Sequence, residues 1–303
     1  MLGLDPDPGA LWPAAADAVQ RDGRVVGERA IGEGTVGERA ARAVLGHCRA
    51  VIDAAGGACV AVKPQLARFE LLGAPGWAAL EATVAHAHER GLLVIADGKR
   101  GDIDVSAKAY AGALLGGAES PFGKLPGLGA DLVTVNPLMG VDALEPFVAA
   151  ARTSGAGVLV LVRTSNPGAS DVEDLATDDG CAVWERIAQI VARLGADGVG
   201  ESGLSDVGAV VGATEPGHLA RARELMAHAP FLLPGVGAQG GRVEELAAAF
   251  APGRAGGLVS ASRSIVGAHL KGGGEPAAAA REEAERLRET AWELSADLSA
   301  DVR

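Results

Sequence analysis

Charged residues follow an apolar run near the middle of the chain, in a spacing that could do chemistry. Residues 92–96 are all apolar and predict a strand buried on both faces, and the pattern Asp-x-Lys-x-x-Asp follows it directly as Asp97, Lys99 and Asp102. Because strand side chains alternate, we expect Asp97 and Lys99 on one face and Asp102 in the loop beyond. Burying this much charge is costly, so the cluster is either a satisfied ion-pair network or a site that aims charge at a substrate.

Lysine is rare in this chain, and its positions favour a functional site. Only five of the 27 basic residues are lysines, so arginine carries the ordinary surface charge. Two of these lysines follow apolar runs: Lys99, and Lys63 after residues 58–62. A compact ammonium group can donate a proton in a reaction, whereas a guanidinium group stays protonated.

Eight apolar runs alternate with helical patterns along the chain. Nearly all of them lack the polar alternation of a half-exposed strand, which is typical of a parallel sheet covered by helices. Eight such strand–helix units predict an α/β fold, a (β/α)8 TIM barrel, formed as a single domain by residues 1–303. The expected strands are residues 2–5, 58–64, 92–99, 132–137, 157–165, 207–214, 231–237 and 257–263. The expected helices are residues 36–55, 77–90, 103–117, 141–153, 181–194, 219–228, 242–250 and 276–294.

Active sites of such barrels form where the strands end, and polar residues of this chain gather there. The residues at or just after the predicted strand ends are Asp5, Lys63, Asp97, Lys99, Asn136, Ser165, Gln239 and Arg263. Taken alone, Asp5 also suits a turn or a helix cap before the breaker residues 6–9. Scattered loop residues, however, would not place charged groups at the ends of three neighbouring strands.

A glycine-rich segment and an arginine predict an anion-binding site. Residues 234–241 link the seventh strand to a helix, and Arg263 follows the eighth strand. Glycines permit close approach of the backbone, and helix-start N–H groups together with a guanidinium bind phosphate. Any tight strand-to-helix turn also needs glycine, so Arg263 is what favours the phosphate interpretation. We therefore expect a ligand that carries a phosphate at one end and reacts at the other.

Composition excludes several classes of partner. The net charge of −12 and the pI near 5.0 argue against binding to nucleic acid or to an anionic membrane. The three cysteines are widely spaced without a Cys-x-x-Cys pair, which fits a reducing compartment and buried free thiols. No apolar run approaches the ~18 residues of a membrane span, and no signal-like start is present. We expect a cytoplasmic protein.

The sequence resembles the orotidine 5'-phosphate decarboxylase family over nearly the whole chain. Residues 97–103, Asp-Gly-Lys-Arg-Gly-Asp-Ile, are similar to the signature of that family, and Val-Lys-Pro-Gln at residues 62–65 resembles its longer bacterial subgroup. The other segments that match in order are Asp5, Lys63, residues 165–168, 210–214 and 234–241, and Arg263. The resemblance implies decarboxylation of orotidine 5'-phosphate to UMP, the last step of UMP synthesis, by a homodimer that uses no cofactor and no metal.

The resemblance also implies roles for individual residues. Lys63, Asp97, Lys99 and Asp102 form the charged catalytic array, in which Lys99 protonates C6 of the pyrimidine and Asp97 lies beside the departing carboxylate. Asp102 reaches into the site of the partner subunit. The residues implied to bind the substrate are Asp5, Ile103, Ser106, Ser165, Pro234, Gly237, Gln239, Gly240 and Arg263.

Within that binding set, the resemblance divides the substrate into three parts. Asp5 and Lys63 hold the ribose hydroxyls, assisted by Asp102 and Ser106 from the partner subunit. Ser165 meets the pyrimidine ring. The phosphate is gripped by Gln239 and Arg263.

The chain departs from the family pattern at two places. Its first predicted strand starts at residue 2, without the lead-in that the family normally has, so we expect altered packing at the barrel floor. After Asn136 and Pro137 the family has an aromatic residue, where this chain has Leu138. This second change affects the packing of one loop and touches none of the charged array.

Two rival functions are open to the same sequence. A metal-dependent sugar-phosphate decarboxylase or aldolase on a related barrel shares the Asp-x-Lys-x-x-Asp pattern, but it needs an acidic ligand where this chain has Lys63. A non-catalytic barrel that binds a phosphate ligand would be expected to have lost part of the charged array. None of the array is lost, which favours the decarboxylase.

Overall fold

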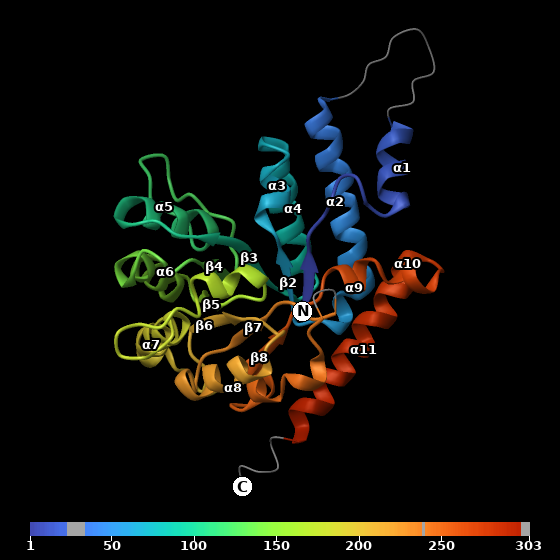
Figure 1. Cartoon of the computed structure of the whole chain (residues 1–303). Coiled ribbons are helices and arrows are strands. Elements are labelled where there is room, and N and C mark those ends of the chain that lie inside the picture. The colour runs from blue at the N-terminus through green and yellow to red at the C-terminus, as the bar shows by residue number, and fades with distance from the viewer. Residues whose placement is uncertain (23–33, 238–239, 298–303) are drawn as a thin grey trace. The chain divides into compact units, whose positions relative to one another are not determined.

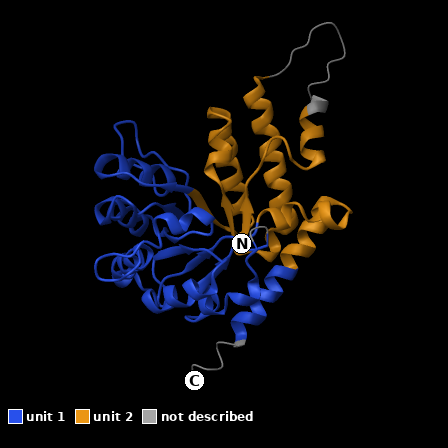
Figure 2. Cartoon of the chain, in the orientation of Figure 1, with its two compact units in different colours: residues 1, 98–261, 286–303 blue, residues 2–97, 262–285 orange. Residues whose placement is uncertain are grey.

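The computed structural model of the protein describes residues 1–22, 34–237 and 240–297. The chain forms two compact units, which Figure 2 shows in different colours. Unit 1 comprises Met1, residues 98–261 and residues 286 onward, and unit 2 comprises residues 2–97 and 262–285. Strands and helices alternate along the chain (Figure 1).

The elements have the following bounds. The strands are β1 (Leu2–Leu4), β2 (Ala61–Pro64), β3 (Leu93–Arg100), β4 (Leu132–Val135), β5 (Gly157–Arg163), β6 (Val207–Val211), β7 (Phe231–Leu233) and β8 (Gly257–Val259). The helices are α1 (Pro13–Asp22), α2 (Val36–Ala55), α3 (Leu66–Glu70), α4 (Ala74–Glu89), α5 (Asp104–Leu114), α6 (Val141–Ser154), α7 (Val183–Gly195), α8 (Pro216–Leu225), α9 (Arg263–Val266), α10 (Ala268–Gly272) and α11 (Pro276–Asp297).

In unit 2, β1, β2 and the first part of β3 run parallel. Leu2 pairs with Val62, and Ala61 pairs with Leu93. Every residue of β1 and β2 is buried, which explains why their sequences are apolar without alternation. Because these strands are parallel, the residues that directly follow them lie at the same edge of the sheet.

Helix α2 of unit 2 begins where its sequence predicts. The side chain of Thr35 accepts a hydrogen bond from the N–H of Glu38 at 3.3 Å, and the Glu38 carboxylate accepts one from the N–H of Thr35. This capping box satisfies two of the backbone donors that a helix start leaves without partners. The buried side of α2 includes His47 and Cys48.

In unit 1, strands β4 to β8 run parallel and neighbour one another in chain order. Val133 pairs with Val158, Val158 with Val207, and Phe231 with Gly257. All five residues of β6 are buried, as a sheet covered on both faces requires.

The predicted α/β class is confirmed, because parallel strands alternate with helices in the order of a (β/α)8 barrel. Several element predictions are wrong, and one is the seventh strand, which ends at Leu233 and not at residue 237. Residues 242–250 form short 3-10 segments instead of an α-helix, since Val243, Leu246 and Ala249 are buried at a spacing of three. The eighth strand ends at Val259, and Arg263 instead begins helix α9.

A buried arginine joins several elements of unit 1. Arg223 of α8 is 7% exposed, and its guanidinium lies 3.7 Å from the centre of the Phe231 ring. Burial lowers the pKa of Arg223 to about 10, so the group is still a cation at pH 7. Its N–H groups donate to the backbone carbonyls of Met226, Ala227, Ala229, Ala248, Ala249 and Gly256.

Replacing this fork of donors should destabilise the fold. We expect Arg223→Lys to lower the free energy of unfolding by about 2–4 kcal/mol, because an ammonium group cannot reach the same set of buried carbonyls. Urea denaturation measures the change. Arg221→Lys on the same helix is the control, since Arg221 is exposed and pairs with Glu185 and Glu224, and it should leave the midpoint nearly unchanged. Equal midpoints for both variants would contradict the role of Arg223.

Candidate active site

Unit 2 contains a cleft of about 660 Å³ at the ends of β1 and β2. Three of the predicted site residues line it together: Asp5, Lys63 and Arg263. The other lining residues are Leu4, Pro6, Asp7, Ala10, His47, Cys48, Gln65, Arg68, Ser262, Val266, Gly267 and Leu270. Lys63, Arg68 and Arg263 contribute cationic groups to the cleft, and Asp5 and Asp7 contribute carboxylates, so it offers partners for both an anionic group and hydroxyl groups.

A buried ion pair joins β2 to β3 beside this cleft. Lys63 Nζ donates to Asp97 Oδ2 at 2.6 Å, and Gln65 Nε2 donates to the same oxygen at 3.2 Å. Lys63 is 8% exposed and Asp97 is 4% exposed, so each charge relies on the other in place of water. The sequence did not point to Gln65, although it stands two residues after Lys63, at the spacing that shares a strand face.

Two neighbouring residues of α2 complete the cleft wall without adding charge. Burial lowers the pKa of His47 to about 4, so the imidazole is neutral at pH 7. Burial raises the pKa of the Cys48 thiol to about 12, and the negative charge of Asp5 adds to this effect. Cys48 therefore stays a thiol at neutral pH, and it is not a nucleophile.

Lys99 lies near the end of β3 in a conformation that side-chain-bearing residues rarely adopt. Its φ angle is +46°, in the left-handed region that costs roughly 1–2 kcal/mol. Within unit 1, its N–H donates to Thr134 Oγ1 at 2.9 Å, and the N–H of Asn136 donates to the Arg100 carbonyl at 2.7 Å. The alternation that predicted a shared face for Asp97 and Lys99 requires an extended backbone, which the chain does not have at Lys99.

The loop after β3 carries Asp102, Ile103 and Ser106 toward α5 of unit 1. Asp102 Oδ1 accepts the N–H of Ile103 at 2.8 Å. Ile103 directly precedes α5 and is 51% exposed, while Ser106 lies half-buried in the first turn of the helix. Unit 1 thus presents an apolar side chain immediately next to the Asp102 carboxylate.

Ser165 follows β5 of unit 1, on a loop whose base is anchored by charge. Arg163 donates from Nε and Nη2 to the two carboxylate oxygens of Asp174 at 2.8 and 2.9 Å, which lowers the pKa of Asp174. Thr164 donates from its N–H and its hydroxyl to the Glu173 carboxylate at 2.8 and 2.9 Å. These contacts hold residues 173–174, at the far end of the loop, beside Arg163 and Thr164, which directly precede Ser165.

The predicted phosphate loop follows β7 of unit 1 and begins at Pro234. Gly237 and Gly240 have φ angles of +76° and +92°, where any side chain would be strained. The N–H of Gly237 donates to the Gly241 carbonyl at 2.9 Å. Gln239 lies outside the described residues.

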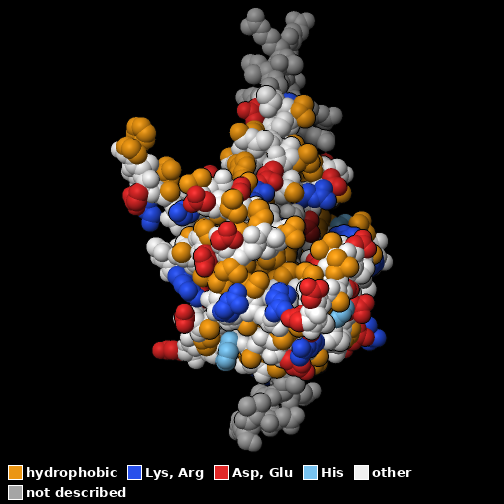
Figure 3. Space-filling view, turned by 60° about the vertical axis from the view of Figure 1, so that its left-hand side comes forward, with side chains coloured by type: hydrophobic (Ala, Val, Ile, Leu, Met, Phe, Trp, Pro, Cys, Tyr) orange, Lys and Arg blue, Asp and Glu red, His pale blue; other side chains and the backbone are white. Residues whose placement is uncertain are grey.

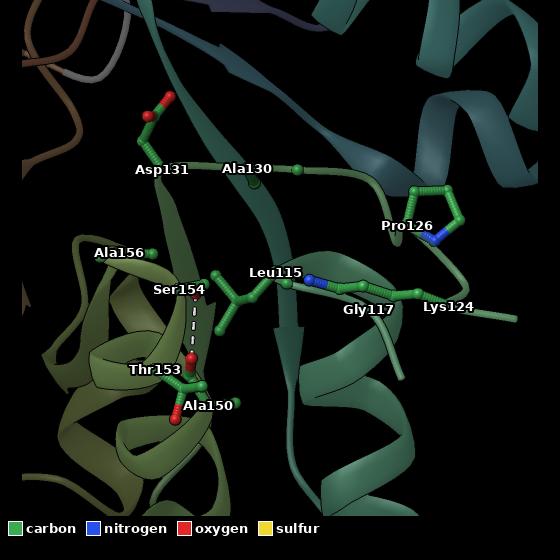
Figure 4. Close-up of a pocket in the computed structure, with 13 residues that line it drawn as sticks. Leu115, Gly117, Lys124, Pro126, Ala130, Asp131, Ala150, Thr153, Ser154 and Ala156 are labelled. Carbon is green, nitrogen blue, oxygen red and sulfur yellow. Dashed lines mark hydrogen bonds between the residues drawn. The ribbon is translucent and has the colours of Figure 1, made fainter. Parts of the chain in front are cut away.

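A larger hollow in unit 1 lacks convergent ligand-binding groups (Figure 4). It has a volume of about 770 Å³ and lies near the N-terminal ends of β4 and β5, away from the strand ends where barrel sites form. Thr153 and Ser154 donate to carbonyls of their own helix. Figure 4 shows the Asp131 carboxylate pointing away from the other lining side chains, so Lys124 is the one charged group directed along the hollow.

The described part of the chain shows no metal cluster, no membrane-spanning helix and no disulfide. There, no group of three or more His, Cys, Asp or Glu side chains is arranged to hold a metal ion. No helix among the described residues is long and apolar enough to cross a membrane. The three cysteines, Cys48, Cys59 and Cys181, are free thiols.

The structure thus brings together the unit 2 part of the predicted site. Asp5, Lys63 and Arg263 share one cleft, and Asp97 joins them through Lys63. The predicted residues that unit 1 holds on its own elements are Lys99, Asp102, Ile103, Ser106, Ser165, Pro234, Gly237 and Gly240. The sequence did not indicate His47, because an apolar helix face marks its residues as core rather than as cleft wall.

Comparisons with known proteins agree with this arrangement. Residues 44–282 match the model of a family described as "Orotidine 5'-phosphate decarboxylase / HUMPS family". The chain is 44% identical to the orotidine 5'-phosphate decarboxylase of Rhodopirellula baltica, over 76% of this chain and 75% of the relative. It is 47% identical to that of Deinococcus radiodurans, over 79% and 81%. The solved structure of Leishmania donovani OMP decarboxylase is 30% identical, with a TM-score of 0.66, and the match covers 96% of this chain and 93% of that one.

Removing one partner of the buried ion pair should destabilise the protein strongly. Lys63→Met leaves the buried Asp97 carboxylate without its ammonium partner, and we expect the free energy of unfolding to fall by about 3–5 kcal/mol. The double variant Lys63→Met/Asp97→Asn removes both charges and should recover most of this loss. Urea denaturation of the parent, both single variants and the double variant measures the coupling. A loss in the double variant that equals the sum of the two single losses would show that the two charges do not stabilise one another.

Proposed function

The chain belongs to the orotidine 5'-phosphate decarboxylase family, and we propose that it is a carboxy-lyase that converts orotidine 5'-phosphate to UMP and carbon dioxide. The observation that carries this proposal is the Lys63–Asp97 pair beside a cleft that also holds Asp5 and Arg263. Two residues after Asp97, the same strand β3 carries Lys99. Asp97, Lys99 and Asp102 follow one another along the chain in the order of the motif that resembles the family signature, which supports the proposal.

The reaction explains why such charges are needed. When carbon dioxide leaves C6, the electron pair of the broken bond stays on a carbon that no neighbouring carbonyl can delocalise. Enzymes lower barriers by roughly 8–23 kcal/mol, and this reaction should need the upper end of that range. A preorganised ammonium group beside the developing charge supplies part of it. We assign that group to Lys99, which gives its proton to C6, with Asp97 beside the departing carboxylate.

We propose that binding of the phosphate, at the far end of the substrate from C6, helps to organise the site around the pyrimidine. In a chain with a net charge of −12, a phosphate can be held only by a local cluster of donors, and the cleft provides Arg263. Asp5 and Lys63 are assigned to the ribose hydroxyls, and Gln239 assists Arg263. The other residues assigned to substrate binding are Ile103, Ser106, Ser165, Pro234, Gly237 and Gly240. Binding energy from the phosphate can then be used to fix the array.

A metal-dependent sugar-phosphate enzyme on a related barrel is not favoured. That chemistry needs an acidic ligand at the end of the second strand, where this chain places Lys63. The Lys63 ammonium lies 2.6 Å from Asp97 and occupies the position beside that carboxylate where a cation would bind. The relatives at 44% and 47% identity are both named orotidine 5'-phosphate decarboxylase.

We also propose that the active form is a cytoplasmic homodimer in which each chain is one barrel domain, residues 1–303. Large apolar side chains are exposed on the elements that follow β3 and β4 of unit 1, and Figure 3 shows hydrophobic side chains exposed across one face. They are Ile103 (51%), Val105 (72%), Tyr110 (39%), Leu138 (77%) and Met139 (46%). Exposed apolar surface of this kind supports contact with another protein. A second copy that covers Ile103 would meet Asp102.

The proposed activity should not depend on a metal. After exhaustive chelation, the protein should still remove the ultraviolet absorbance of orotidine 5'-phosphate and yield UMP, because an ammonium group meets the developing charge. Lys99→Ala should lower kcat/KM by at least about a thousandfold. Lys124→Ala, which changes a lysine of the other hollow, is the matched control and should keep activity. Loss of activity in chelator that magnesium restores would support the metal-dependent rival.

Shared sites should show complementation between inactive subunits. We expect Lys99→Ala and Asp102→Ala homodimers each to be inactive, because each site lacks one essential group. After mixing, dissociation and reassembly, half of the dimers should be mixed, and each mixed dimer has one site with both defects and one with neither. About a quarter of the parental activity should therefore return. The extent of subunit exchange is measured in the same samples from the masses of the dimers. Full exchange without any recovery would place Asp102 in the site of its own chain.

A further inference from the structure

One buried tryptophan connects two elements that line the cleft of unit 2. Trp12 is 5% exposed, and its indole Nε1–H donates to the Val266 carbonyl at 2.9 Å. Its backbone N–H donates to His47 Nδ1 at 3.1 Å. The two rings also meet edge to face, with centroids 5.5 Å apart and an interplanar angle of 81°.

Each end of this connection leads to a residue assigned to the substrate. Residues 5–12 form the segment after β1, which begins with Asp5 and supplies several residues of the cleft wall. Val266 is the last residue of α9, and Arg263 is the first. The indole therefore spans from the segment of Asp5 to the helix of Arg263.

Helix α9 needs such an external contact. It has only four residues, too few to be stable by its own hydrogen bonds. The carbonyls at a helix end also lack intrahelical partners, and the indole N–H satisfies one of them. A second close approach acts at the other end, because a Cβ added to Gly3 would lie 2.7 Å from the Cβ of Ser262.

His47 fixes the tryptophan in turn. The ring is 4% exposed, and burial keeps it neutral at pH 7, with a pKa of about 4. Since Nδ1 accepts the N–H of Trp12, this nitrogen carries no proton. Without that acceptor, a buried backbone N–H would lose its partner, and the segment before α1 would lose its attachment to α2.

We propose that Trp12 and His47 are positioning residues that hold the Arg263 helix at a set distance from the Asp5 segment, so that the phosphate and ribose ends of the ligand find their partners already spaced. This inference rests on the proposed function for the identity of the ligand. Neither residue touches the reacting atoms. Their effect is preorganisation, which spares the ligand the cost of ordering α9 on binding.

The test compares binding of UMP with binding of uridine, which lacks the phosphate, by competition calorimetry. Trp12→Phe keeps the ring and removes the indole N–H. We expect it to weaken UMP binding about tenfold and uridine binding less than twofold, because a charged contact of this kind is worth roughly ten- to a hundredfold. Trp292→Phe, at a tryptophan that is 58% exposed in unit 1, is the control and should change the affinity for neither UMP nor uridine.

Two further variants separate positioning from general stability. His47→Leu removes the acceptor and should behave like Trp12→Phe, whereas His47→Asn keeps an acceptor near the place of Nδ1 and should bind UMP within about twofold of the parent. In an Arg263→Ala background, Trp12→Phe should not weaken UMP binding any further. Equal losses for UMP and uridine, or the same loss in the Arg263→Ala background, would overturn the proposal.

The binding assay also keeps this inference distinct from the proposed function. A parent protein that fails to decarboxylate orotidine 5'-phosphate would count against the proposed function alone. The ratio of UMP affinity to uridine affinity would still be measurable for every variant. An unchanged ratio in Trp12→Phe, with activity intact in the parent, would reject the positioning role alone.

Discussion

The buried ion pair between Lys63 and Asp97 is the interaction on which the rest of the site depends. Each charge has lost most of its water, so neither is tolerable without the other. Parallel pairing of β2 with β3 brings the two side chains within 2.6 Å, and Gln65 adds a second donor to the same carboxylate oxygen. A slip of one residue in that pairing would turn one of the charges into the core. The ion pair therefore favours this register of β2 against β3, and this register is what brings the two charges together.

Around this pair the cleft combines fixed charge with neutral walls. Arg263 and Arg68 add positive charge and Asp5 and Asp7 add negative charge, while His47 and Cys48 are kept uncharged by burial. Ionised groups in those two positions would compete for the phosphate or for Lys63. In a strongly acidic chain, an anionic nucleotide needs local positive groups of this kind at its phosphate. The Lys63 ammonium takes the place beside Asp97 where a divalent metal would bind.

Strain and short elements appear where the chemistry is assigned. Lys99 has a left-handed backbone whose N–H donates a hydrogen bond to Thr134, and α9 is a helix of four residues held through Trp12. Such features persist only where the surrounding structure over-determines them. The regular strands and helices hold the backbone in place, and these local departures from regular geometry set the directions of individual side chains. A barrel can in this way serve one reaction through the few residues beyond its strand ends.

The amino-acid sequence by itself determined the alternation of parallel strands and helices, because continuous apolar runs and helical spacing are local properties. It also identified the Asp97–Lys99–Asp102 pattern, Lys63 and the glycines of the phosphate loop, since rare lysines and obligatory glycines stand out without a fold. Only the tertiary structure decided that Gln65 shares the Asp97 oxygen, that Trp12 joins His47 to α9, and that residues 242–250 form 3-10 turns. Those features depend on which groups meet across the sheet and on how far each is buried. Neither quantity is encoded in the spacing of residues along one segment.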